Sequence, residues 1–302
     1  MEPIIYKVSG GITHLLGGLQ SCINAAKATG RDVWIDRSHD YASFPFPLSD
    51  FFDFSAVGVS VENVVLPEDH PCWGHIQWHK DGTRLLGADG AARPKAPLAP
   101  PPPSKVRPNG ERVRGGSGPT QWLPFEIHDG WREEHVWFAG GCSHWPEKMK
   151  LQKKVKDECL SVVPQWPYIC LHYRNTDIQT DPRLLYEFVD ELKPTRPIFL
   201  CTDHLASVQK IKNKLHNYDV RCINEPPEVS HNLHYGHPDK RTAVLTALID
   251  MCIMRYAEVL SPPFAMVRPN GEQVHEGSGL TQWLHKMRVN QDHDLFFDHK
   301  LE

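Results

Sequence analysis

The sequence predicts an α/β protein of two halves, each built from parallel strands that helices connect. Residues 4–36 read as a short apolar strand, a glycine-rich segment, a helix and a second strand. From residue 166 onward, apolar strands alternate with amphipathic helices in the same way. An irregular, proline-rich stretch separates the two regions. Strand–helix–strand units of this kind imply parallel sheets.

The first half contains one clear strand–helix–strand unit. A strand covers "IIYKVS" at Ile4–Ser9, and the segment "GGITHLLGG" follows it. Apolar residues from Leu19 to Ala26 recur at helical spacing, and Gly30 provides a stop, so a helix is expected over 19–29. "DVWID" at residues 32–36 predicts the second strand, and "VGVSVENVVL" at residues 57–66 predicts a further one.

The middle of the chain has no regular pattern. "ADGAARPKAPLAPPPPSK" at residues 88–105 contains a proline run, which excludes a helix and a central strand. We expect an exposed loop or insertion over about 87–118 and a boundary between the halves within 141–165. The halves are taken as residues 1–150 and 151–302.

The second half alternates regularly between strands and helices. After residue 238, "DKRTAVLTALIDMCIMRYA" predicts the longest helix and "EVLSP" a final buried strand. The expected strands are 168–173, 197–203, 218–223 and 258–262, and the expected helices are 182–193, 204–215, 239–257 and 280–289.

An eighteen-residue peptide occurs twice, as "VRPNGERVRGGSGPTQWL" at 106–123 and "VRPNGEQVHEGSGLTQWL" at 267–284. Two copies are too few for a solenoid, which needs at least about three stacked units. The second copy leads into a predicted helix. The first follows the proline run, where a duplicated segment tolerated in a surface loop is the favoured interpretation. A contact with an acceptor substrate and a docking motif for a partner are the alternatives.

The composition of the chain argues against several classes of protein. The chain has 33 basic and 37 acidic residues, which argues against a surface that wraps nucleic acid. No apolar run approaches the ~18 to 20 residues of a membrane helix, and the N-terminus shows no signal pattern. The 8 cysteines form no C-x-x-C pair, which favours free thiols in a reducing compartment. We therefore expect a cytoplasmic protein.

The sharpest candidate site is "LHYRNTD" at residues 171–177, at the carboxyl end of a predicted strand. Ligands of parallel α/β sheets bind outside these strand ends. Arg174 has a planar donor fork suited to a phosphate or diphosphate. His172 could donate to the same group, and Asp177 could orient the loop. An ordinary strand-end ion pair of Arg174 with Asp177 is the alternative.

Polar residues also follow the next strand. Thr202 and Asp203 end "PIFLCTD", so they should point toward the same edge, although Asp203 could instead cap the following helix. Asp250 stands in the apolar helix "AVLTALIDMCIMRYA". A buried carboxylate needs a partner, which could be Arg255 or, in a functional interpretation, a nucleotide base.

The glycine-rich segment near the N-terminus is a weaker candidate. It matches neither G-x-G-x-x-G nor a P-loop, yet it places flexible backbone N–H groups between a strand and a helix. His14, Gly17 and Gly18 of this segment are included as donor-binding candidates. A tight turn without a ligand is the alternative.

Two groups of residues have metal-like spacing, but we expect no metal site. They are Cys72 with His75 and His79, and His231 with His234 and His237. In a chain with 18 histidines such groups arise easily, and neither has a companion of the structural zinc type.

Taken together, these features resemble the fucosyltransferase superfamily, which includes α1,6-fucosyltransferases, rhizobial nodulation fucosyltransferases and protein O-fucosyltransferases. The opening "GGITHLLGGLQSCINAAKATGRDVWID", the "LSDFFDF" segment, "HYRNTD" and "FLCTDH" carry the resemblance. It covers most of the chain in order and is thin in the middle. The resemblance implies two Rossmann-like halves facing a cleft, as in GT-B glycosyltransferases, with the acceptor on the N-terminal half and the nucleotide sugar on the C-terminal half.

The resemblance also implies roles for individual residues. "HYRNTD" matches the H-x-R-x-x-D pattern of the family's "HxRRxD" motif, so Arg174 would hold the donor diphosphate, with Asn175 in place of the second arginine. Asp250 would face the nucleotide base. The family's serine-rich loop beside the donor phosphates corresponds to "EGSGLTQWL", which places Ser278, Gly279 and Thr281 at a helix start.

The function implied is an inverting, metal-independent glycosyltransferase without a cofactor. It would move a sugar from a nucleotide-sugar donor, GDP-fucose as first guess, to a hydroxyl of a glycan or glycoprotein. Asp181 is the nearest carboxylate to the family's general base. Because of Asn175, UDP-sugars such as UDP-xylose or UDP-rhamnose stay open, as does a non-catalytic protein that binds nucleotides or glycans.

Overall fold

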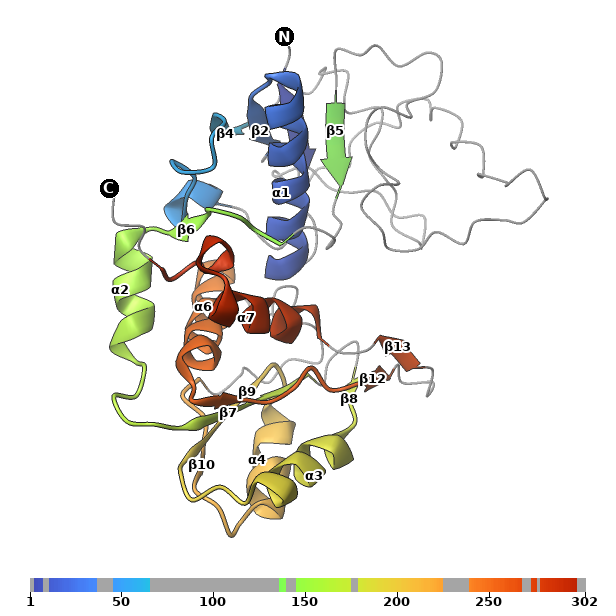
Figure 1. Ribbon diagram of the computed structural model, residues 1–302, viewed down its shortest axis with the longest axis vertical. Coiled ribbons are helices and arrows are strands. Elements are labelled where there is room, and N and C mark those ends of the chain that lie inside the picture. The colour runs from blue at the N-terminus through green and yellow to red at the C-terminus, as the bar shows by residue number, and fades with distance from the viewer. Residues whose placement is uncertain are drawn as a thin grey trace, which may run out of the picture. The chain divides into compact units, whose positions relative to one another are not determined.

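The computed structural model describes residues 3–7, 11–36, 46–65, 136–139, 145–174, 179–224, 239–267, 273–275 and 278–297. The chain divides into two compact units, Met1–Met149 and Lys150–Glu302 (Figure 1). The proline-rich stretch and the first copy of the repeated peptide lie outside the described residues.

The first unit contains a four-stranded sheet in the order β4-β2-β1-β5, and every neighbouring pair is parallel. Numbered along the chain, this is the order 3-2-1-4 of a Rossmann half. Ile4, Ile5 and Tyr6 of the central strand are fully buried. The elements of this unit are β1 (Ile4–Lys7), α1 (Ile12–Thr29), β2 (Val33–Asp36), η1 (Leu48–Asp50), β3 (Phe52–Asp53), β4 (Val61–Val64) and β5 (Val136–Ala139).

Helix α1 begins earlier than the sequence predicted. Its N-cap is Gly11, so Gly17 and Gly18 lie inside the helix and the expected glycine loop is wrong. The reason is close packing on β1. The hydroxyl of Tyr6 donates to the Leu15 carbonyl at 2.7 Å, and a Cβ at Gly18 would lie 2.8 Å from Tyr6 Oη. Gly18 therefore allows the helix to approach the strand, and it supplies no loop N–H groups.

The second unit contains a parallel sheet in the order β10-β9-β7-β11, which is again 3-2-1-4 along the chain. Its elements are β6 (Lys150–Leu151), α2 (Lys153–Ser161), β7 (Ile169–Tyr173), β8 (Gln179–Thr180), α3 (Pro182–Leu192), β9 (Ile198–Thr202), α4 (Leu205–Lys214), β10 (Val220–Arg221), α6 (Lys240–Tyr256), β11 (Val259–Leu260), β12 (Met266–Val267), β13 (Gln273–His275), α7 (Gly279–Val289) and η5 (Gln291–His293).

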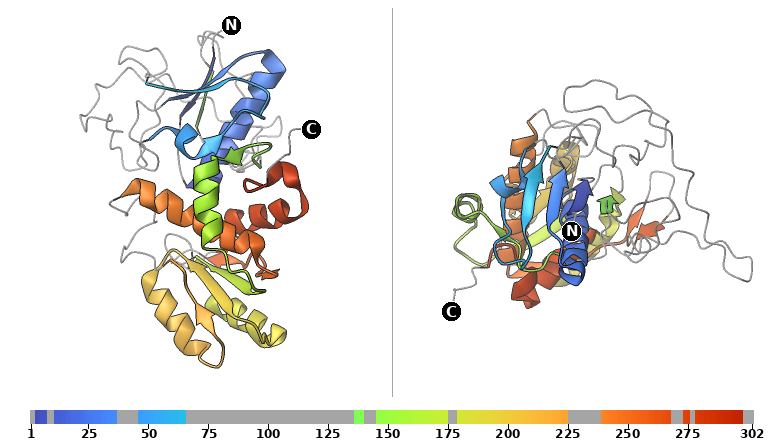
Figure 2. Two further views of the ribbon diagram at one scale, coloured as in Figure 1. Left: turned by 90° about the vertical axis from the view of Figure 1, so that its left-hand side faces the viewer. Right: turned by 90° about the horizontal axis from the view of Figure 1, so that it is seen from above.

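Helices cover both faces of this sheet (Figures 1 and 2). One face packs on α3 and α4 through Ile169, Leu171, Ile198 and Leu200, which share a core cluster with Leu185, Val189, Ile211 and Leu215. The other face packs on α6. There Tyr168 meets Phe199 edge to face at 5.0 Å, and its hydroxyl donates to the Ile253 carbonyl at 2.8 Å. The alternating pattern of β7 and β9 thus fixes which helix each residue meets.

The second copy of the repeated peptide has a defined structure in its described part. It starts at the last residue of β12, continues through β13 and ends within α7. β12 pairs antiparallel with β13 and with β8, where Met266 is opposite Thr180. This small sheet links the peptide to the segment that follows β7.

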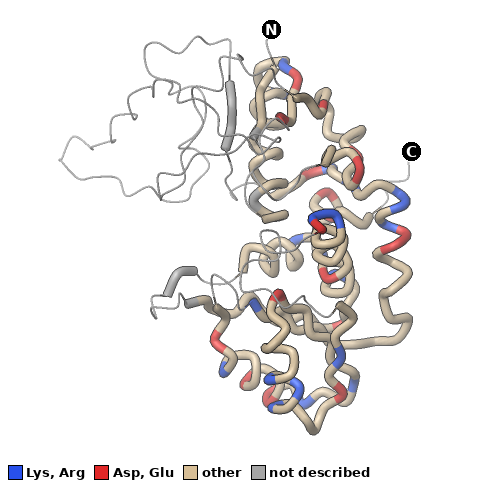
Figure 3. Tube along the Cα trace, turned by 180° about the vertical axis from the view of Figure 1, so that it is seen from behind, with Lys and Arg blue, Asp and Glu red and all other residues tan. Residues whose placement is uncertain are grey.

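These observations confirm the α/β class and the two Rossmann-like halves. The helix predicted to be the longest, α6, is one residue shorter than α1, which has 18. None of the described helices is long and apolar enough to cross a membrane. Basic and acidic residues are interspersed along the described trace (Figure 3).

Candidate functional site

The order of the strands in the second sheet identifies the place at its carboxyl edge where a ligand is expected. β7 lies between β9 and β11, so the connections leave it toward opposite sides, and this is a topological switch point. In open parallel sheets, ligands bind outside the carboxyl ends of the strands at such a point. His172 lies at the end of β7, Arg174 directly follows it, and Ser261 follows β11.

His172 connects the two strands and α7. Its backbone N–H donates to Ser261 Oγ at 3.1 Å, and its Nδ1 is hydrogen-bonded to Thr281 Oγ1 at 2.7 Å. Loss of water around the ring, together with the positive charge of Arg174, lowers the pKa of His172 to about 4. The imidazole is therefore neutral near pH 7 and serves as a fixed hydrogen-bonding group.

The first turn of α7 carries a buried hydroxyl without a partner. Ser278 is the N-cap residue and is only 4% exposed, yet its Oγ makes no hydrogen bond with the described residues, including the cap bond. Such a hydroxyl costs free energy unless a ligand satisfies it. A Cβ at Gly279 would meet nothing within 4 Å. The first N–H groups of a helix have no intrahelical acceptor and attract anions.

Arg174 is held at the end of β7 by its backbone. Its N–H donates to Thr180 Oγ1 at 3.3 Å, and its carbonyl accepts from the Thr180 N–H at 2.8 Å. The guanidinium is close enough to His172 to lower the pKa of the imidazole. We call His172, Arg174, Ser261, Ser278 and Thr281 the switch-point cluster. It contains one cation, a neutral imidazole, two hydroxyls in the first turn of α7 and the Ser261 hydroxyl after β11.

The end of β9 is polar, as the sequence predicted. Thr202 is buried, and its Oγ1 accepts from the His204 N–H at 3.4 Å. The N-cap of α4 is His204, whose Nδ1 lies 2.8 Å from Ser207 Oγ. The alternative in which Asp203 caps this helix is therefore wrong, because the helix begins one residue later.

Asp250 does not pair with Arg255, so that alternative is also wrong. Arg255 instead forms an ion pair with the buried Asp294, at 2.7 Å. Asp250 accepts a hydrogen bond from Asn224 Nδ2 at 3.0 Å. Burial removes the carboxyl group of Asp250 from water and raises its pKa to about 7. The hydrogen bond from Asn224 opposes this rise, and the negative charge of the nearby Asp203 adds to it.

The raised pKa of Asp250 predicts a stability change with a definite sign. The folded state favours the protonated form, so this contribution is complete below the ordinary pKa of 3.8 and is lost as pH rises through about 7. Asparagine cannot ionise, so Asp250→Asn avoids the loss of stability that ionisation of the buried carboxyl group causes at higher pH. We expect the variant to match wild type near pH 4 and, after allowance for partial exposure, to exceed it by roughly 2 kcal/mol near pH 8.

Urea unfolding of both proteins across this range is the measurement. The depressed pKa of His172 acts in the opposite direction, since its contribution is lost as pH falls below its ordinary value of 6.5 toward about 4. It is present in both proteins and cancels in the difference. A variant that is less stable than wild type near pH 8 would show that Asp250 is ionised and well solvated.

Asp181 is engaged in structural contacts. It is the N-cap of α3, where Oδ1 accepts from the Arg183 N–H at 2.9 Å. Both carboxylate oxygens also accept from the Arg183 guanidinium, at 2.7 to 3.1 Å. These hydrogen bonds lower the pKa of Asp181. A carboxylate held in this way is a weak base, so the geometry favours a capping role over general-base catalysis.

Two substitutions of Asp181 distinguish a capping role from a role as general base. Asp181→Ala should lower the free energy of unfolding by about 1 kcal/mol, because the cap is lost. Asp181→Asn should keep most of this stability, since asparagine caps equally well. If Asp181 were the base, Asp181→Asn would lose activity while retaining stability. Unfolding curves and transfer rates measured on both variants decide between the two.

Several predicted features lie outside the described residues. They include Asp177 with Asn175, the side chain of His14, and both metal-like groups, Cys72 with His75 and His79 and His231 with His234 and His237. Among the described residues, no group of three or more His, Cys, Asp and Glu side chains is arranged to hold a metal ion.

Three residues of the site were missed in the sequence. Ser261 directly follows the last buried strand, so the strand-end rule applied to Thr202 would have found it. Thr180 and Asn224 have no such signal. Their roles depend on the backbone path after β7 and β10.

The geometry defines the class of protein as one with two Rossmann-like α/β units, each with parallel strands in the order 3-2-1-4. No family model matches the chain, and no curated protein matches its sequence. The fold is similar to that of fucosyltransferase NodZ from Bradyrhizobium, with a TM-score of 0.51 and 15% identity over 94% of this chain and 93% of that one. The chain thus has a fucosyltransferase-like fold of the GT-B type.

Two further structures are similar at lower scores. NodZ alpha-1,6-fucosyltransferase soaked with GDP-fucose has a TM-score of 0.49 and 16% identity over 94% of this chain and 92% of that one. The apo-form of POFUT1 has a TM-score of 0.45 and 10% identity over 86% of this chain and 90% of that one.

Proposed function

We propose that the protein is a glycosyltransferase that transfers a sugar from a nucleotide-sugar donor to a hydroxyl of a glycan or glycoprotein. The observation that carries this proposal is the buried Ser278 hydroxyl at the start of α7. It has no partner in the described chain and belongs to the same cluster as Arg174. A diphosphate placed there would give the Ser278 hydroxyl the partner that it lacks, and would accept hydrogen bonds from the first N–H groups of α7 and from the Arg174 guanidinium.

The proposed chemistry is an inverting displacement. The acceptor hydroxyl attacks the anomeric carbon and gives its proton to a carboxylate base or to solvent water. The bond from that carbon to the diphosphate oxygen breaks, and the nucleoside diphosphate leaves with the electron pair of that bond. Arg174 and the N–H groups of α7 stabilise the leaving charge, so this proposal needs no metal and no cofactor. Gly279 lets the diphosphate approach the helix closely, since the space beside its Cα is open. Thr281 and His172 fix each other beside it.

The remaining donor contacts are proposed from the positions of their residues. Thr202 and Asp203 end β9 beside β7, so they lie along the same carboxyl edge as His172. Asp250 and Asn224 form a hydrogen-bonded pair suited to a nucleotide base. Asp177 is proposed to orient the loop after Arg174. The first unit is proposed to hold the acceptor, and the cytoplasm is the proposed compartment.

GDP-fucose is the first donor to test, because the fold is fucosyltransferase-like and "HYRNTD" matches the H-x-R-x-x-D pattern. UDP-xylose and UDP-rhamnose follow, since Asn175 replaces the second arginine.

One observation favours a second candidate, a non-catalytic protein that binds nucleotides or glycans. The proposed base Asp181 is occupied by Arg183 and by its cap bond.

Thermal unfolding with GDP, UDP, ADP and CDP and their sugar conjugates, in buffer with EDTA, tests the function. A ligand at ~100 times its dissociation constant adds about 2.7 kcal/mol to native stability. We expect one nucleoside diphosphate and its sugar conjugate to raise the melting temperature. Release of that diphosphate on addition of a glycan acceptor distinguishes the enzyme from the non-catalytic protein. Absence of any stabilisation would contradict both the enzyme and a non-catalytic protein that binds nucleotides.

A further inference from the structure

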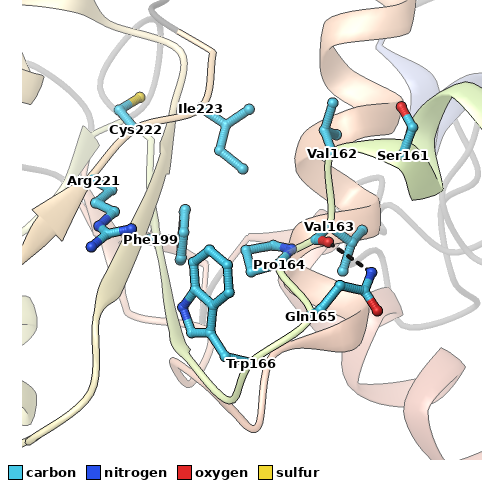
Figure 4. A pocket seen from close by; sticks show the side chains of 10 residues that line it. All are labelled: Ser161, Val162, Val163, Pro164, Gln165, Trp166, Phe199, Arg221, Cys222 and Ile223. Atoms are coloured by element: carbon cyan, nitrogen blue, oxygen red, sulfur yellow. Dashed lines mark hydrogen bonds between the residues drawn. The ribbon is translucent and has the colours of Figure 1, made fainter.

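We propose a second carbohydrate-binding site on the second unit, centred on Trp166. A cavity of about 400 Å³ lies between two walls (Figure 4). One wall is the loop from Ser161 to Trp166, which connects α2 to β7. The other is Phe199 of β9 together with Arg221 to Ile223 at the end of β10. Ligand pockets commonly have this size, with mostly apolar walls and a few polar groups.

Trp166 is unusual among the tryptophans. It is 48% exposed, whereas the other tryptophans whose side chains the structure describes are partly or fully buried: Trp34, Trp145 and Trp283. A large aromatic ring left in water loses the stabilisation that burial gives. A single exposed ring is common by itself, and its place in the wall of a cavity is what makes it a candidate for ligand contact. Pro164 and Phe199 line the cavity beside the ring (Figure 4).

Polar groups surround the ring without adding net charge. The Arg221 guanidinium lies 5.9 Å from the Trp166 ring centroid, and both carboxylate oxygens of Asp219 accept from it at 2.6 to 3.0 Å. The amide of Gln165 donates to the Val163 carbonyl at 3.2 Å, and no other hydrogen bond of that amide is found in the described chain. Its carbonyl oxygen is left as an acceptor.

This combination fits one ring of a neutral sugar. A pyranose has an apolar face of C–H groups, which can lie on an indole ring, and hydroxyls at its edge, which can bond to a guanidinium, a carboxylate and an amide. Because Asp219 neutralises Arg221, the site has no excess positive charge to select a phosphate. The choice of a glycan over other amphipathic molecules rests on the proposed function.

The Trp166 end of this cavity is distant from Arg174. Trp166 precedes the amino end of β7, whereas Arg174 follows its carboxyl end. The five residues of β7 between them span roughly 17 Å at about 3.3 Å per residue. A sugar bound at Trp166 would therefore belong to a distant part of the acceptor, or to another branch of it. Binding energy from such remote groups selects among acceptors.

Fluorine NMR of the protein labelled with 5-fluorotryptophan tests this site without any donor. The Trp166 signal is the one that disappears in Trp166→Phe. Cellotetraose, xylotetraose and tetra-N-acetylchitotetraose are the probes. We expect at least one of them to shift this signal saturably while the other tryptophan signals stay in place.

Trp166→Ala should weaken binding of that oligosaccharide about tenfold or more, as measured by calorimetry, because an aromatic anchor is lost. Tyr256→Ala is the matched control and should bind normally. Tyr256 is also exposed, at 41%, with the Arg255 guanidinium 5.4 Å from its ring, but it does not line the cavity. The melting temperatures of both variants verify folding.

Two results would overturn the proposal: no shift of the Trp166 signal with any of the three oligosaccharides, or unchanged affinity in Trp166→Ala. Neither bears on the proposed function, which is read separately from stabilisation by nucleoside diphosphates. A nucleoside diphosphate that shifts the Trp166 signal directly would place a nucleotide in this cavity and overturn the carbohydrate assignment.

Discussion

Arg174→Ala should weaken binding of the nucleoside diphosphate by about 100-fold, whichever base the protein selects. A guanidinium paired with a diphosphate in a partly buried site forms charge-assisted hydrogen bonds, and loss of one partner of such a pair costs about 2 to 5 kcal/mol. Arg174 is placed for this by its backbone bonds to Thr180 at the end of β7. Titration calorimetry of wild type and variant gives the ratio of dissociation constants.

Two further variants show whether the fork or only the charge matters. Arg174→Lys keeps the charge and loses the planar fork, so it should fall between wild type and alanine. Arg183→Ala removes an exposed guanidinium at the start of α3, where it pairs with Asp181, and should bind normally. Equal losses in Arg174→Ala and Arg183→Ala would mean that general positive charge, and not a specific contact, holds the ligand.

Ser278→Ala should separate stability from binding. Its hydroxyl is buried and makes no hydrogen bond with the described residues, so the substitution breaks no hydrogen bond within that part of the chain. The usual cost of about 1 kcal/mol for replacing an N-cap serine does not apply, because the cap bond is absent. We expect the free energy of unfolding without ligand to be unchanged or higher, while affinity for the diphosphate falls about tenfold.

Thr281→Val is the matched control, three residues further along α7. Its hydroxyl is bonded to His172 Nδ1, so the substitution leaves a buried ring nitrogen without its partner. The free protein should lose about 1 to 3 kcal/mol. If Ser278→Ala were destabilising to the same extent, its hydroxyl would have a partner in the free protein. The argument for a ligand at this position would then fail.

Much of the fold could be predicted because the spacing of apolar residues along the sequence matches the period of the strand or helix that buries them. The strand at Ile169–Tyr173 and the helix at Pro182–Leu192 have clear apolar patterns and stop signals. The start of α1 could not be predicted. The glycines of "GGITHLLGG" indicate a loop by propensity, whereas Gly18 serves the tight packing of the helix on Tyr6. Tertiary contact decided the conformation against local preference.

The candidate site was predictable where chemistry follows a strand end. That rule selected Arg174, His172 and Thr202 as candidates, and the structure places all three at the carboxyl edge of the sheet. The partners of Asp250 and Asp181 were not, because Asn224 and Arg183 act through side-chain geometry that no spacing rule contains. Ser278 was expected at a helix start, and its burial without a partner is visible only in three dimensions.

A crystal structure with the nucleoside diphosphate that stabilises the protein tests the central claim most directly. We predict the diphosphate at the start of α7, with Ser278 Oγ and the Arg174 guanidinium within hydrogen-bonding distance of its oxygens. A diphosphate bound elsewhere, with Ser278 Oγ still without a partner, would contradict the donor site.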